Sequence, residues 1–248
     1  LAELAAMVDH GRGVESFVAS IETIVHGTTV ATNATLTGTG AKSALLTTEG
    51  IRDALEMRRG IREEQYNNAY TNVKPLVPRY LRAGVKGRLD RAGREIAPLD
   101  LAGIDAAIAE FRREGVEAVS ICFMNSYANP AHEAAAAERV RTAMPDAFLT
   151  VSSTLLPSIR FYERVSTTAL NSYVGPKLNR YVEQLVSRLA SAGFRGTLLI
   201  MQSNGGVMAP EVARSSPALT LLSGPAGGPG AGLFYAKALG VDRAITTD

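Results

Sequence analysis

The stretch Val25-His26-Gly27-Thr28-Thr29-Val30-Ala31-Thr32-Asn33 is the one that best predicts the fold of this chain. Residues 21–25 indicate a short strand, Gly27 permits a tight turn, and the small residues from Thr29 on indicate a helix. A strand that enters a helix through Gly and Thr presents backbone N–H groups and hydroxyls at the positive end of the helix dipole, where an anion can bind. An ordinary turn in which Thr28 or Thr29 caps the helix explains the same pattern, so the spacing leaves both alternatives open.

Length and composition describe a globular chain without a polyelectrolyte partner. The 248 residues are 46% hydrophobic and 20% charged, and 26 Lys and Arg face 24 Asp and Glu. This balance gives no electrostatic case for nucleic acid. No apolar run reaches membrane-spanning length and no signal peptide is visible, so we expect a cytoplasmic protein without a membrane partner.

The cysteine and histidine content argues against disulfide and zinc chemistry. Cys122 is the only cysteine and lies in an apolar run, which predicts a buried and inert thiol. The three histidines, at positions 10, 26 and 132, share no metal-ligand spacing.

Strands and helices are expected to alternate along most of the chain, which predicts an α/β fold with a parallel or mixed sheet. The expected strands are 21–25, 42–47, 81–89, 94–98, 116–123, 148–152, 197–201, 219–222 and 243–248. The expected helices are 13–20, 29–37, 51–57, 101–113, 130–143, 163–192 (with a break near Gly175-Pro176) and 230–239. The turn at 90–93 indicates a hairpin, and the polar segment 59–78 indicates an irregular excursion.

Three loops share one design, in which glycine with hydroxyl or amide residues follows an apolar strand. They follow Val25, Met201 and Leu222; the second contains Asn204, Gly205 and Gly206, and the third contains Ser223, Gly224, Gly227 and Gly228. In open α/β sheets ligands bind at the carboxyl ends of the strands, so the three loops are expected to converge on one site. None has the Walker lysine or the dinucleotide spacing.

Two further residues have side chains suited to catalysis. Asp248 closes an expected strand and could hold Mg²⁺, although capping of the next element explains it equally well. His26 could act as a general base, or it could be a structural hydrogen-bonding residue. The chain begins without Met inside an expected helix and ends with an expected strand, so we expect a fragment of a longer protein.

Ordered sequence blocks resemble the hydantoinase/oxoprolinase family, A-type subunit. The blocks cover nearly the whole chain: 25–33, 47–53, 76–79, 115–119, 129–133, 156–160, 162–164, 166–168, 201–207 and 223–228. Asn125 stands where family members often carry His. The resemblance implies an incomplete actin-like, sugar-kinase-like ATPase fold (ribonuclease-H-like) with a hairpin-containing insertion. It implies a truncated N-terminal domain over 1–147 and the beginning of the core domain over 148–248.

The resemblance also implies an ATP- and Mg²⁺-dependent enzyme that activates a cyclic amide, of hydantoin or 5-oxoproline type, by phosphorylation. Asp248 would then begin the second phosphate motif, as a catalytic residue and metal ligand. His26 would be catalytic, and Gly27, Thr28, Thr29, Asn33, Ser223, Gly224, Gly227 and Gly228 would line the nucleotide site. Asn204, Gly205 and Gly206 would contact the small-molecule substrate, and a B-type subunit would complete a hetero-oligomer.

The sequence leaves two alternatives open. Residues 58–68 resemble the ketone-carboxylase branch, whose members carboxylate acetone or acetophenone. A non-catalytic scaffold subunit that keeps the fold is the other. The 248 residues by themselves are expected to be inactive, because the first phosphate motif of the family is missing.

Overall fold

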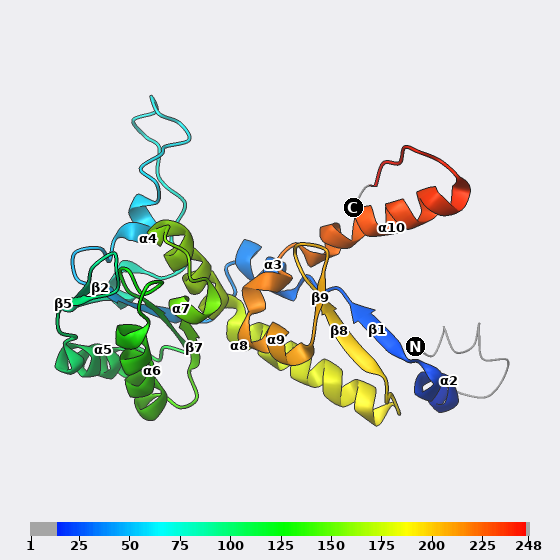
Figure 1. The fold of residues 1–248 in the computed structure, drawn as a ribbon, viewed down its shortest axis with the longest axis horizontal. Helices are drawn as coiled ribbons and strands as arrows, with labels where there is room; N and C mark the ends of the chain where they lie inside the picture. Colours follow the sequence, from blue (N-terminus) through cyan, green and yellow to red (C-terminus); the bar gives the residue numbers. More distant parts are fainter. Residues whose placement is uncertain (1–13, 247–248) are drawn as a thin grey trace. The chain divides into compact units, whose positions relative to one another are not determined.

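The chain forms two compact units, and the polypeptide passes between them twice. The computed structural model describes residues 14–246. Unit 2 comprises Gly40–Pro176, and unit 1 comprises the described residues before Gly40 and from Lys177 on. Unit 1 is therefore built from two distant segments of sequence, with unit 2 inserted between them (Figure 1). The boundary expected between residues 147 and 148 separates two family domains and not these two compact units. It therefore stays a prediction.

Unit 1 contains a small mixed sheet of order β1-β8-β9. β1 (Thr23–His26) runs parallel to β8 (Thr197–Met201), and β8 pairs antiparallel with β9 (Val207–Met208). The helices of unit 1 are α2 (Val14–Ser20), α3 (Val30–Leu36), α9 (Pro210–Ser215), the 3₁₀ helix η2 (Pro217–Thr220), α10 (Ser223–Leu239) and the second part of α8 (Phe161–Ser191). The strand and helix expected around Gly27 are confirmed.

Unit 2 is built on a parallel sheet of order β3-β2-β6-β7. These strands are β2 (Ser43–Thr48), β3 (Arg82–Val85), β6 (Ala118–Cys122) and β7 (Phe148–Val151). Every residue of β2 and β6 is buried, as expected for central parallel strands that are covered on both faces. The other elements are α4 (Ala54–Met57), the 3₁₀ helix η1 (Arg79–Leu81), the hairpin strands β4 (Arg88–Leu89) and β5 (Glu95–Ala97), α5 (Leu101–Arg113), α6 (Ala131–Ala143), α7 (Ser152–Leu155) and the first part of α8. The expected α/β class with a hairpin is confirmed.

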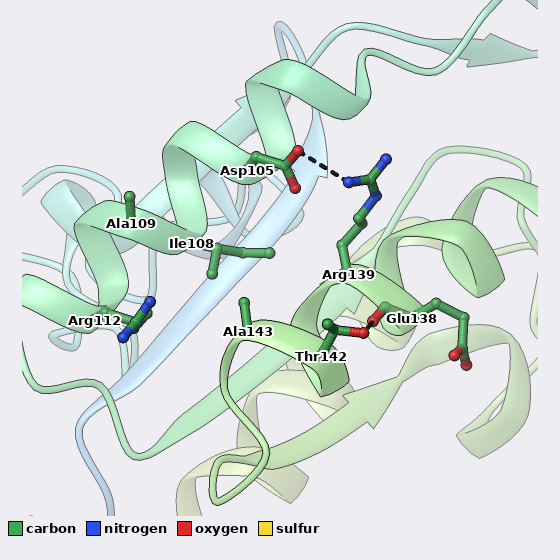
Figure 2. Close-up of a pocket in the computed structure, with 8 residues that line it drawn as sticks. All are labelled: Asp105, Ile108, Ala109, Arg112, Glu138, Arg139, Thr142 and Ala143. Carbon is green, nitrogen blue, oxygen red and sulfur yellow. Dashed lines mark hydrogen bonds and ion pairs between the residues drawn. The ribbon is translucent and has the colours of Figure 1, made fainter.

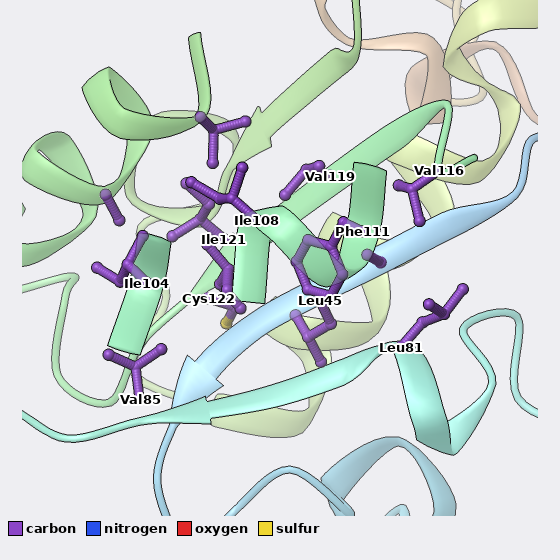
Figure 3. Packing of buried hydrophobic residues seen from close by; sticks show 14 of the residues in the cluster. Leu45, Leu81, Val85, Ile104, Ile108, Phe111, Val116, Val119, Ile121 and Cys122 are labelled. Carbon is purple, nitrogen blue, oxygen red and sulfur yellow. The ribbon is translucent and has the colours of Figure 1, made fainter. Parts of the chain in front are cut away.

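Helix α5 shows how local sequence directs the packing of unit 2. Ile104, Ile108 and Phe111 recur at helical spacing and are all buried in the main apolar cluster (Figure 3). The Asp100 carboxylate accepts a hydrogen bond of 2.9 Å from a first-turn backbone amide and caps the helix. Gly115, with a φ of +65°, ends it as the sequence predicts.

Helix α8 differs from its expected form. The break expected near Gly175-Pro176 is wrong, because one helix runs through Pro176. The carbonyl of Tyr173, in the turn before the proline, accepts a hydrogen bond of 2.8 Å from the Ala41 amide. A Cβ on Gly175 would come within 2.4 Å of the Phe148 ring, so the glycine allows close packing. Contacts with the rest of unit 2 thus support the helix where its own sequence is weak.

The region after residue 216 also corrects the sequence prediction. The expected strand 219–222 is wrong, because residues 217–220 form η2 and Leu222 is left-handed, with a φ of +57°. The expected loop Ser223–Gly228 is instead the start of α10, where Pro225 stands in the first turn and no helical N–H is required of it. The expected strand 243–248 is not formed over residues 243–246, and residues 247 and 248 lie outside the described part.

Two smaller differences lie in unit 2. The expected strand 81–89 is divided into β3 and β4, because Gly87 has a φ of +136° that no regular strand contains. The expected helix 51–57 is reduced to α4. None of the helices over residues 14–246 is both long and apolar enough to cross a membrane.

Candidate functional site

The turn between β1 and α3 contacts the start of α10. The Ser223 hydroxyl donates a hydrogen bond to the Thr28 carbonyl at 3.1 Å, and the Leu222 amide donates to the Thr32 hydroxyl at 3.1 Å. Ser223 is fully buried and Thr28 is 6% exposed. Two of the predicted glycine-and-hydroxyl segments are therefore neighbours in space although Thr28 and Ser223 are 195 residues apart.

The loop between β8 and β9 reaches the same place. The amide of Ser203 donates to a carbonyl of η2 at 2.7 Å. The Asn204 side-chain oxygen accepts from the Gly206 amide at 2.9 Å, and Gly205 has a φ of +82°. A Cβ on Gly205 would lie 3.5 Å from the Ala226 carbonyl oxygen in α10. The predicted convergence of three segments is thus found within unit 1, although the third segment follows η2 instead of a strand.

Met201, the last residue of β8, lies near two of these glycines and packs tightly against one of them. A Cβ on Gly27 would lie 3.9 Å from the Met201 sulfur, and a Cβ on Gly227 would lie 3.1 Å from it. Gly227 therefore lets α10 approach the end of β8 closely. It shapes the site by its small size, whereas the 3.9 Å distance at Gly27 is an ordinary contact.

The first turn of α10 is exposed beside these loops. Gly224 and Pro225 are exposed, and a Cβ on Gly224 would meet no atom within 4 Å. Leu222 precedes the helix in a left-handed conformation, which costs a non-glycine residue about 1–2 kcal/mol. Because α10 has 17 residues, its start carries unpaired N–H groups and the positive end of the dipole. An oxyanion is the natural ligand of such a helix start.

The two hydroxyl groups in the turn before α3, those of Thr28 and Thr29, differ in their roles. Thr29 occupies the position before α3, but its hydroxyl makes no cap to the helix and instead accepts from the Asn33 side-chain amide at 3.2 Å. The Thr28 hydroxyl accepts from the Val30 amide at 3.3 Å. Thr29 and Asn33 are exposed, so their polar groups are available to a ligand.

His26 ends β1 and pairs with a residue of α8. Its Nε2 lies 2.7 Å from the Tyr181 hydroxyl, and the two rings stack with centroids 5.8 Å apart at 29°. Burial lowers the pKa of His26 below its ordinary value, so its ring is neutral near neutral pH. The sequence indicated His26 but not Tyr181, because no motif links two residues that are 155 positions apart.

The metal ligand expected at Asp248 lies outside the described residues. Thr246, the last described residue, packs on α10: a Cβ on Gly228 would lie 3.7 Å from its hydroxyl. A Cβ on Gly232 would clash with Thr246 at 2.3 Å. Over residues 14–246, no group of three or more His, Cys, Asp or Glu is arranged to hold a metal ion.

Unit 2 holds a buried charged network to which the sequence blocks gave no role. Glu133 and Arg164 are both fully buried, and an Arg164 nitrogen lies 3.9 Å from the Glu133 carboxylate. The Glu133 carboxylate accepts hydrogen bonds of 2.8 Å from two backbone amides, one after β6 and one after β7. It also accepts a hydrogen bond of 2.6 Å from the Ser152 hydroxyl. Arg164 donates to the hydroxyls of Ser126 and Ser152. The network fastens the ends of β6 and β7 to α6 and α8.

A groove of about 540 Å³ lies between α5 and α6, within unit 2 (Figure 2). An ion pair of 3.2 Å between Asp105 and Arg139 lies at its side. The groove is lined by Asp105, Ile108, Ala109, Arg112, Glu138, Arg139, Thr142 and Ala143. None of the site residues predicted from the sequence is among them.

Comparison with known proteins identifies relatives of the chain. It is 40% identical over 240 residues to the caprolactamase subunit alpha of Pseudomonas jessenii, covering 96% of this chain and 34% of the relative. It is 28% identical over 251 residues to the acetophenone carboxylase gamma subunit of Aromatoleum aromaticum, covering 96% and 34%. The crystal structure of the ATP-dependent caprolactamase from Pseudomonas jessenii matches 97% of this chain and 35% of that one, with a TM-score of 0.88 and 40% identity. The chain thus spans about a third of the length of these relatives.

Family models match the chain in the order that its sequence blocks predicted. The model of the hydantoinase/oxoprolinase N-terminal region matches residues 4–144, and that of hydantoinase/oxoprolinase matches residues 164–248. The chain belongs to the hydantoinase/oxoprolinase family.

Proposed function

We propose that this chain is part of an ATP-dependent hydrolase of cyclic amides and that unit 1 holds the phosphates of the nucleotide. The observation that carries the proposal is the hydrogen bond from Ser223 to the Thr28 carbonyl, which joins the turn before α3 to the exposed start of α10. A lactam is a cyclic amide, and the chain is 40% identical to a caprolactamase subunit but 28% identical to an acetophenone carboxylase subunit. The similarity therefore favours amide hydrolysis over ketone carboxylation.

The residues present suit a phosphate group. The open space beside Gly224 would accommodate a phosphate group, and the unpaired amides of the first turn of α10 would donate hydrogen bonds to its oxygens. The exposed Thr29 hydroxyl and Asn33 amide would donate further hydrogen bonds to the phosphate. Gly27, Gly227 and Gly228 have no side chain that would keep the phosphate away from the backbone. Bound ATP would supply a phosphoryl group that turns a poorly reactive amide oxygen into part of a leaving group.

Three further assignments belong to the same proposal. Asp248 would hold Mg²⁺ beside the phosphates, and residues 204–206 would contact the substrate. The relatives are named as subunits, so we propose a hetero-oligomer that contains a B-type subunit. We also propose that the complete protein acts in the cytoplasm.

A substrate panel tests the reaction class. The polypeptide should be prepared at the full length of its relatives together with its partner subunit, and ATP hydrolysis measured with caprolactam, hydantoin and 5-oxoproline. A parallel series contains bicarbonate with acetone or acetophenone. We expect ATP turnover to depend on a cyclic amide. Turnover that requires bicarbonate and a ketone would favour the carboxylase alternative, and a complex that binds no nucleotide would favour the scaffold.

A matched pair of threonine variants tests the phosphate site. Thr29→Val removes an exposed hydroxyl before α3, and Thr37→Val removes one just after the same helix. Because a hydrogen bond to a charged oxygen is worth about 1.5–3 kcal/mol, we expect Thr29→Val to weaken ATP binding roughly tenfold or more. Thr37→Val should bind ATP as the wild type does. Calorimetric Kd values that are equal for all three proteins would contradict a role of Thr29 in the nucleotide site.

A further inference from the structure

We propose that Tyr181 is a positioning residue that holds His26 in its Nδ1–H tautomer, so that His26 serves the site as a hydrogen-bond donor and not as a general base. The tautomer is inferred from the contact between His26 and Tyr181 and does not depend on the proposed function. The donor role rests on the proposed function.

Both partners of this hydrogen bond are held in place. His26 lies opposite Ile200 in the parallel pairing of β1 with β8, so its backbone is fixed by the sheet. Tyr181 stands on α8 between Leu178 and Val182, which lie on the same helix and are fully buried. The 2.7 Å contact and the stacked rings therefore join two rigid elements.

The direction of the hydrogen bond follows from the chemistry of the two groups. A phenol loses its proton at a pKa of about 10, and the N–H of a neutral imidazole is a much weaker acid. A neutral imidazole nitrogen is also a better acceptor than a phenol oxygen, because it is protonated at a pKa of about 6.5. The Tyr181 hydroxyl thus donates to Nε2, and the ring proton of His26 stays on Nδ1. Burial keeps the ring neutral, as its lowered pKa indicates.

This arrangement limits what His26 can do. A neutral imidazole has one unprotonated nitrogen, and in His26 the lone pair of that nitrogen accepts the hydrogen bond from the Tyr181 hydroxyl. The Nδ1–H group has no hydrogen-bond partner among residues 14–246. His26 can therefore donate a hydrogen bond but cannot take up a substrate proton without breaking its bond to Tyr181. Since Gly27 and Thr28 follow directly, the donor belongs to the turn that meets α10.

Nitrogen NMR of the histidine rings tests the tautomer directly. The chain has three histidines, and His132, whose Nε2 lies 2.7 Å from Glu95, serves as an internal reference. At about pH 8, above the ordinary histidine pKa, we expect the His26 nitrogen shifts of the Nδ1–H form. Tyr181→Phe should lower the ratio of Nδ1–H to Nε2–H by roughly two- to twelvefold, the equilibrium equivalent of one hydrogen bond.

Tyr173→Phe is the matched control, because it makes the same substitution on a buried ring of the same helix without touching His26. It should leave the His26 shifts unchanged. An Nε2–H form in the wild type, or a ratio that Tyr181→Phe does not change, overturns the proposal.

Kinetics on the polypeptide of full family length test the donor role of His26 separately from its tautomer. We expect Tyr181→Phe to lower kcat/KM for ATP by roughly two- to twelvefold and Tyr173→Phe to leave it unchanged. A changed tautomer with unchanged kcat/KM would overturn the donor role. A wild type that neither binds nor hydrolyses ATP would overturn the proposed function, while the NMR result would still decide the tautomer.

Discussion

Cys122 shows how burial controls the chemistry of a single side chain. The thiol lies in the central strand β6 and is fully buried, and this burial raises its pKa to about 12. Only the thiolate reacts, so almost none of the reactive form exists near neutral pH. We expect no alkylation of the folded protein and complete alkylation in denaturant, as measured by mass spectrometry. Alkylation of the native protein at the rate of a free thiol would contradict the buried position.

Arg164 provides a second test at the scale of one residue. Arg164→Met leaves the Glu133 carboxylate buried without its positive partner, and breaking such a pair costs about 3–5 kcal/mol. Arg139→Met removes an exposed arginine that pairs with Asp105 at 3.2 Å, which is worth about 0–1 kcal/mol. Urea unfolding measures both free energies. Equal losses for the two variants would show that the buried network contributes no more than a surface pair.

At the scale of elements, two glycines with different surroundings make opposite predictions. A Cβ on Gly196, which precedes β8, would lie 2.3 Å from the Glu22 carbonyl oxygen, so Gly196→Ala should destabilise by about 1–3 kcal/mol. A Cβ on Gly230, inside α10, would meet no atom within 4 Å, so Gly230→Ala should stabilise by about 0.5–1 kcal/mol. Thermal unfolding of the two variants gives the signs. A stabilising Gly196→Ala would contradict the close backbone approach.

Elements with strong local signals were predictable, and those that depend on distant contacts were not. The helix 101–113 has its cap, its apolar spacing and its terminal glycine within its own sequence, and it forms over the expected residues. Residues 219–228 contain an apolar run and then a glycine-rich segment, which locally favour a strand and a loop. Helix α10 begins at Ser223 instead, where Leu222 and Ser223 form hydrogen bonds with Thr32 and Thr28 from a distant part of the sequence.

The candidate site follows the same rule. Its glycines and hydroxyls could be named from the sequence, because their residue types and spacing indicate close backbone approach and hydrogen-bond donors. Tyr181 could not be named, since its contact with His26 joins β1 to a helix far along the chain. The pairing of Glu133 with Arg164 was missed for the same physical reason.

At the scale of the whole molecule, unit 2 has the properties of an independent domain. Its main apolar cluster is drawn entirely from residues 44–169, within its own limits. Its ends are joined by the hydrogen bond from Ala41 to Tyr173, at 2.8 Å. We therefore expect residues 40–176 to fold alone, because a domain with its own core and adjacent termini does not require the flanking chain. Circular dichroism and protection of Cys122 from alkylation would measure this. A reactive Cys122 in the isolated unit would contradict it.

The parallel pairing of β1 with β8 also determines the order in which the two units can fold during synthesis on the ribosome. β1 leaves the exit tunnel before unit 2, but its partner is synthesised only after the whole of unit 2. Unit 2 can therefore condense during translation, whereas β1 must wait as an unpaired segment until Thr197–Met201 emerges. Pulse hydrogen exchange on stalled nascent chains should show the sheet of unit 2 protected before that of unit 1. The strand that leads into the candidate phosphate site would then be made before unit 2 and paired only after it.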